Sequence, residues 1–73
     1  MNNEQERTRI GLRIAELRKE KGWTQEELGN RSGIGRVHIV RIEQGKYDVR
    51  IDTLAAIAEA FGLTVDFIKK KKE

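Results

Sequence analysis

The apolar residues of this chain recur at intervals of three and four positions, the spacing of helices that bury one face. In the first such segment Ile10, Ile14 and Leu17 lie on one side, which predicts a helix from about Glu4 to Lys21. A later segment predicts a second amphipathic helix from about Ile51 to Phe61. A glycine follows each segment, as is common where helices end.

The residues between these segments predict two short helices joined by a tight turn. Thr24 and Glu27 have the spacing of a capping box, in which each side chain accepts a hydrogen bond from the other's backbone. Gly33 can adopt the left-handed conformation that ends a helix, and Gly35 can begin the next one. The pattern is a helix-turn-helix, whose second helix enters the major groove of DNA in the proteins that use it.

The second of these helices presents two different faces. At roughly 100° per residue, one arc holds Arg36, Val37, Val40, Arg41 and Gln44, and the opposite arc holds His38, Ile39 and Ile42. Burying the first arc would bury two arginines without partners, so we expect Ile39 and Ile42 in the core. Val37 and Val40 should then be accessible to solvent.

A short fifth helix is predicted from Val65 to about Lys70, with Val65 and Ile68 facing inward. The expected fold is therefore an all-α, compact domain of five helices without strands. Its predicted core is Ile10, Ile14, Leu17, Leu28, Ile34, Ile39, Ile42, Leu54, Ile57, Ala58 and Phe61.

Length and composition narrow the class of protein. The chain has 73 residues, which predicts a single domain over 1–73, with an ordered core at about 8–68 and a basic tail at 69–73. It has no cysteine, so it has neither disulfides nor thiolate metal sites, as is usual in the cytoplasm, where we expect this protein to act. No apolar run is long enough to span a membrane, and no signal peptide is apparent.

The net charge is only +3, but it is unevenly distributed. Residues 31–50 hold five basic and two acidic side chains, whereas residues 51–68 hold three acidic and no basic ones. The middle of the chain is thus suited to a polyanion. Its basic residues are Arg31, Arg36, Arg41, Lys46 and Arg50. The run Lys69 to Lys72 is either a solvated tail or a weak, sequence-independent attraction to DNA.

The sequence offers no catalytic, cofactor or metal site. His38 is the only histidine, and no cysteine is present to share a metal with it. A carboxylate such as Glu43 needs a second titrating group or a nucleophile for acid-base catalysis, and no such partner is apparent. We therefore do not expect an enzyme.

Taken in order, these motifs resemble the lambda repressor and Cro-type helix-turn-helix domains, the XRE family. The similarity extends from Ile10 to Ile68. It rests on Arg18, on Trp23-Thr24-Gln25 and Leu28, on Gly33-Ile34, on Ile39 with Ile42-Glu43-Gln44-Gly45, and on the run from Ala60 to Asp66.

The resemblance implies a set of DNA contacts. Contacts to bases fall to Arg36, Val37 and Arg41, and contacts to the DNA backbone fall to Gln25, Val40, Gln44 and Lys46. It also implies a structural ion pair between Arg18 and Glu43. The chain departs from the family in having Gly29 where alanine is usual and Gly35 where serine is typical.

These observations predict a sequence-specific regulator of transcription that binds double-stranded DNA through the helix at about 35–44. One recognition helix reads only a few base pairs, so we expect a homodimer, with Val65, Phe67 and Ile68 as candidates for the contact. The alternative is an antitoxin or another interaction module, in which Val37 and Val40 bind a protein such as a toxin.

Overall fold

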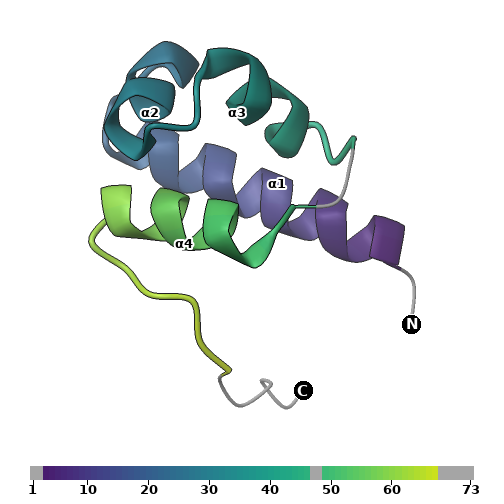
Figure 1. The fold of residues 1–73 in the computed structure, drawn as a ribbon. Helices are drawn as coiled ribbons and strands as arrows, with labels where there is room; N and C mark the ends of the chain where they lie inside the picture. Colours follow the sequence, from purple (N-terminus) through teal and green to yellow (C-terminus); the bar gives the residue numbers. More distant parts are fainter. Residues whose placement is uncertain (1–2, 47–48, 68–73) are drawn as a thin grey trace.

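The computed structural model describes residues 3–46 and 49–67, which contain four α-helices and no strand. The helices are α1 (Asn3–Glu20), α2 (Gln25–Ser32), α3 (Arg36–Glu43) and α4 (Ile51–Ala60). Helices α2 and α3 form one side of the molecule, and α1 and α4 run beneath them (Figure 1). Among the described residues, no helix is long and apolar enough to cross a membrane.

The core lies where these helices meet. Among the described residues, six hydrophobic side chains are buried: Ile14, Leu28, Ile39, Ile42, Ile57 and Phe61. All six belong to the core predicted from the sequence. The other predicted core positions, which are Ile10, Leu17, Ile34, Leu54 and Ala58, are only partly buried. Trp23, Val49 and Ala60 also pack against this core.

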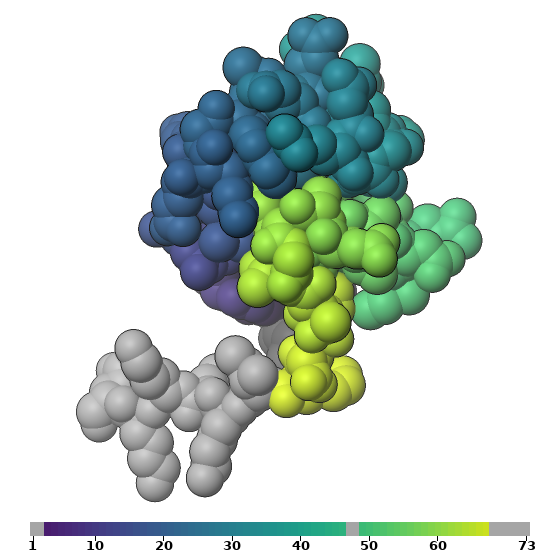
Figure 2. All heavy atoms as spheres, turned by 90° about the vertical axis from the view of Figure 1, so that its left-hand side faces the viewer, coloured from purple at the N-terminus to yellow at the C-terminus, as the bar shows by residue number. Residues whose placement is uncertain are grey.

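The prediction of a fifth helix is wrong for the residues that the structure describes. Residues 63–67 follow α4 without forming a helix, and the rest of the predicted span, including Ile68, lies outside the described residues, as does the basic tail at 69–73. Figure 2 shows the segment after α4 standing away from the helices. Val65 is 47% exposed and Phe67 is fully exposed, so no tertiary packing offsets the cost of ordering so short a helix.

Candidate nucleic-acid interface

The start of α2 is fixed by the predicted capping box. Thr24 Oγ1 accepts a hydrogen bond from the Glu27 backbone N–H at 3.0 Å, and a Glu27 carboxylate oxygen accepts one from the Thr24 N–H at 2.9 Å. Both side chains thereby satisfy backbone donors that a helix N-terminus leaves without partners. Gln25, the first residue of α2, is held next to this cap.

The turn from α2 to α3 depends on glycine. Gly33 ends α2 with a φ of 75°, and Gly35 precedes α3 with a φ of 97°, both in the region that favours glycine. The N–H of Gly35 donates to the carbonyl of Gly29 at 3.2 Å. A Cβ at Gly29 would lie 2.7 Å from the backbone nitrogen of Arg36. Glycine at this position therefore lets the beginning of α3 contact the backbone of α2.

The other end of α3 rests on α1 in a similar way. A Cβ at Gly11 would meet the backbone carbonyls of Ile42 and Glu43, the latter at 2.8 Å. Gly45, two residues after the end of α3, has a φ of 69° and lies close to Thr8 of α1. These close approaches fix both ends of α3 against the backbone or side chains of neighbouring helices.

The rotation of α3 agrees with the prediction at its most informative positions. Ile39 and Ile42 are 0% and 1% exposed, whereas Val37 is 61% exposed. Val40 is partly buried, so it is less accessible than we expected. Arg36, His38, Arg41 and Gln44 are exposed. The outer face of α3 thus carries two arginines and an exposed valine.

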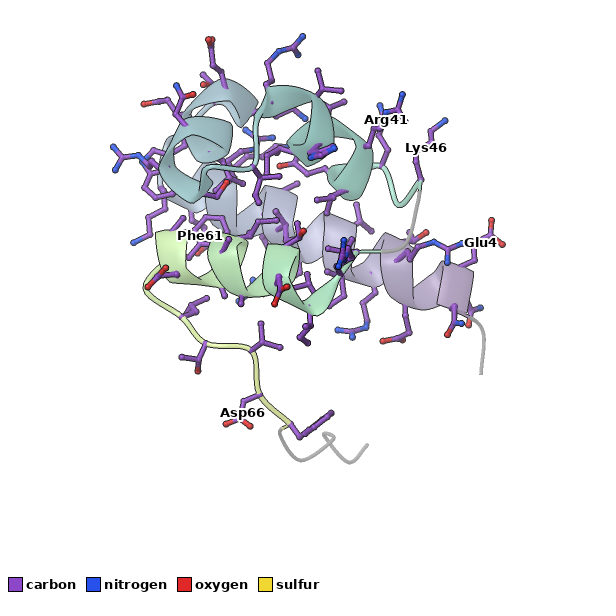
Figure 3. The ribbon with its side chains drawn as sticks, viewed as in Figure 1. Glu4, Arg41, Lys46, Phe61 and Asp66 are labelled. Atoms are coloured by element: carbon purple, nitrogen blue, oxygen red, sulfur yellow. The ribbon has the colours of Figure 1, made fainter. Side chains whose placement is uncertain are left out.

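Figure 3 shows how two of the basic side chains lie. Arg41 near the end of α3 and Lys46 in the turn that follows project to the same side of the molecule, away from α1 and α4. Lys46 is placed by a hydrogen bond from its N–H to the carbonyl of Arg41, at 3.1 Å. The two positive charges therefore lie on one side of the molecule (Figure 3), which is suited to an anionic partner.

Arg31 has a different environment from these residues. Its guanidinium carbon lies 4.4 Å from the centre of the Trp23 ring, close enough for a cation–π interaction. The same indole stacks on Phe61, with ring centres 5.6 Å apart. The charge pattern of the sequence grouped Arg31 with the other basic residues of positions 31–50, but in the structure its guanidinium lies against Trp23.

An ion pair joins the end of α3 to α1, as the resemblance implied. Arg18 Nε donates to Glu43 Oε2 at 2.7 Å, and Arg18 Nη2 donates to Glu43 Oε1 at 3.1 Å. The side chains are 11% and 6% exposed. Arg18 Nη1 also donates to the carbonyl of Trp23 at 2.8 Å, so the guanidinium has partners in α3 and in the loop before α2.

A contact that the sequence did not predict involves Gln25. Its Nε2 donates to Glu43 Oε1 at 3.0 Å, so the side chain assigned to the DNA backbone already has a partner within the protein. The described part of the chain contains no group of three or more His, Cys, Asp or Glu side chains that could hold a metal ion.

Comparison with known proteins places this geometry in a family. The helix-turn-helix family model matches residues 14–68, which include α2, the turn and α3. The chain belongs to the helix-turn-helix family. Its relatives include an uncharacterized HTH-type transcriptional regulator, y4dJ, of Sinorhizobium fredii, which is 38% identical over 75% of this chain and 71% of that protein.

Two further proteins are similar to this helix-turn-helix chain. The immunity repressor of Bacillus phage phi105 is 36% identical over 81% of this chain, a match that covers 41% of the repressor. The crystal structure of the restriction-modification controller protein C.AhdI from Aeromonas hydrophila is similar, with a TM-score of 0.81 and 28% identity. That match covers 86% of this chain and 91% of the controller.

Proposed function

We propose that this protein is a regulator of transcription that binds double-stranded DNA sequence-specifically, with α3 in the major groove. The observation that carries this proposal is the division of α3 into two faces. Ile39 and Ile42 anchor the helix in the core, while Arg36, Val37 and Arg41 remain exposed. The names of the relatives, a phage immunity repressor among them, support the same conclusion.

The exposed face of α3 has the chemistry needed to distinguish base pairs. An arginine can donate two hydrogen bonds to the O6 and N7 atoms of guanine, and an apolar side chain can contact the methyl group of thymine. We therefore propose that Arg36 and Arg41 contact guanines and that Val37 contacts a thymine. Backbone contacts are proposed for Gln25, for Gln44, for Lys46 and for the neighbourhood of Val40.

We also propose that the protein binds as a homodimer. Two recognition helices about 34 Å apart can enter successive major grooves of a pseudo-palindromic site. Val65 and Phe67 are exposed apolar residues beyond α4, which supports their role as candidates for the contact between copies. The third candidate, Ile68, lies outside the described residues.

Two experiments test the proposal. Bound sites are first selected from random duplexes, and the affinity for the selected site and for a scrambled one is then measured as a function of salt concentration. Replacing Arg36 or Arg41 by alanine should weaken binding to the selected site by about 1 to 3 kcal/mol and relax preference at one or two base pairs. Lys46→Ala should instead weaken binding to both duplexes and flatten the slope of log affinity against log salt by roughly one unit.

Arg13→Ala is the matched control for these variants. It removes the same charge from an exposed position of α1, two residues after Gly11, so its side chain points away from the side of α1 that contacts α3. It should leave the ratio of the two affinities unchanged. If Arg36→Ala and Arg41→Ala also leave that ratio unchanged, α3 does not read bases. Salt-tolerant binding to a protein would then favour an antitoxin or interaction module.

A further inference from the structure

The carboxylate of Glu43 connects three helices at one point. Glu43 is the last residue of α3, and it accepts hydrogen bonds from Arg18 of α1 and Gln25 of α2. One carboxylate oxygen, Oε1, accepts from both partners, at 3.1 Å from Arg18 and 3.0 Å from Gln25. The Glu43 side chain is only 6% exposed, so its role depends on these contacts within the protein and not on solvent.

The contact fixes which end of the Gln25 amide faces Glu43. A side-chain amide has a carbonyl oxygen that accepts and a nitrogen that can donate twice. The nitrogen donates one hydrogen bond to Glu43 Oε1. Turning the amide over would put its carbonyl oxygen against the carboxylate, where neither group can donate. Glu43 therefore holds the amide in one orientation and leaves its second N–H for another acceptor.

That second N–H matters because a DNA phosphate accepts hydrogen bonds and does not donate them. Gln25 is partly exposed and stands at the first position of α2, so its amide can still reach a ligand. An amide that is already oriented loses less side-chain freedom when it binds than one that rotates in solvent.

We propose that Glu43 is a positioning residue for DNA binding, which acts by holding the Gln25 amide ready to donate to a phosphate. This inference rests on the proposed function, and it adds a role for Glu43 beyond the ion pair with Arg18. It also links the two ends of the interface, because the residue that closes the recognition helix orients a backbone contact at the start of α2.

The direction in which DNA affinity changes when a carboxylate is removed separates this positioning role from a general effect of charge. Glu43→Gln and Glu26→Gln each remove one negative charge, and Glu26 is the exposed neighbour of Gln25 in α2. Removing a carboxylate near a polyanion should leave binding unchanged or strengthen it, which is the result expected for Glu26→Gln. Glu43→Gln should instead weaken binding by a factor of about two to ten, the range expected for one hydrogen bond.

A double-mutant cycle with Gln25→Leu tests whether the loss passes through Gln25. Affinity for the selected duplex is measured by fluorescence anisotropy at a temperature where circular dichroism shows every variant to be folded. If Glu43 acts through Gln25, Glu43→Gln should cost nothing further in the Gln25→Leu background. An equal loss in both backgrounds overturns the proposal, because Glu43 then acts through the fold or the placement of α3.

Two other outcomes distinguish this inference from the proposed function. If Gln25→Leu binds as tightly as the parent while Arg36→Ala loses preference, Gln25 makes no phosphate contact for Glu43 to position. This inference and the proposed Gln25 contact then fail, while base reading by α3 stands. If the parent protein shows no preference for any selected duplex, both proposals fail.

A measurement on the unaltered protein keeps the inference testable if Glu43→Gln does not fold. Gln44 has an exposed side-chain amide and serves as the internal reference. By NMR, the Gln25 side-chain amide should exchange with water more slowly than that of Gln44, and its signal should shift when the duplex is added. Equal exchange rates for the two amides would overturn the proposal.

Discussion

Replacing Glu43 by alanine should remove a large share of the stability of this domain. The change leaves Arg18, which is 11% exposed, with one remaining hydrogen bond, to the carbonyl of Trp23. Breaking a buried ion pair by removing one partner typically costs about 3 to 5 kcal/mol. Because Arg18 keeps that bond, we expect a loss of about 3 kcal/mol. A chain of 73 residues has only roughly 4 to 11 kcal/mol in total, so the loss is large.

Urea unfolding followed by circular dichroism and by the fluorescence of Trp23, the single tryptophan, measures this loss. By heating, the midpoint should fall by about 12 °C or more. Glu16→Ala is the matched control, because it breaks the exposed pair with Arg13 in α1, where the side chains are 60% and 55% exposed. That change should cost less than about 1 kcal/mol. If Glu43→Ala costs no more than Glu16→Ala, the buried pair is not structural and the reasoning fails.

Two other predictions concern the stability of the fold. A Cβ at Gly29 or Gly11 would crowd the backbone of α3, so alanine at either site should lower the free energy of unfolding by about 1 to 3 kcal/mol, despite alanine's higher helix propensity. An unchanged or raised urea midpoint would contradict this. Thr24→Ala, which removes half of the capping box, should cost about 1 kcal/mol in the same assay, and no loss would show that the cap contributes nothing.

The elements predicted correctly are those whose signals are local. Thr24 and Glu27 lie three positions apart, and the capping box needs only that spacing. The face of α3 followed from a similar argument, because burying Arg36 and Arg41 without partners would be costly, whereas burying Ile39 is favourable. In each case the physical cause lies within a few residues along the chain.

The prediction of a fifth helix was wrong because it relied on local spacing alone. Whether so short a helix forms depends on the residues that pack against it. Val65 and Ile68 have helical spacing, but spacing alone does not supply a surface for them to cover. With Val65 half exposed and Phe67 fully exposed, the described part of this segment gains little from forming a helix. A correct prediction would have required knowing whether the other helices offer a surface against which this segment can pack. The sequence of the segment itself does not show that.

Long-range contacts of single side chains were not predictable from spacing either. Gln25 and Glu43 are 18 positions apart, and their hydrogen bond depends on how α2 and α3 cross. Gly11 gave a clue that could have been used, because a glycine inside an amphipathic helix often marks a close approach of two backbones. It did not indicate which helix would approach it.

These contacts divide the residues of the interface into two groups with different constraints. Gly29, Gly11 and Glu43 fix the position of α3, and a change at any of them alters packing or a buried ion pair. Arg36 and Val37 are exposed, and substitutions at exposed sites usually alter stability little. If α3 reads bases as proposed, substitutions at Arg36 or Val37 should change the preferred DNA sequence while the helix that carries them stays in place, because both residues are exposed.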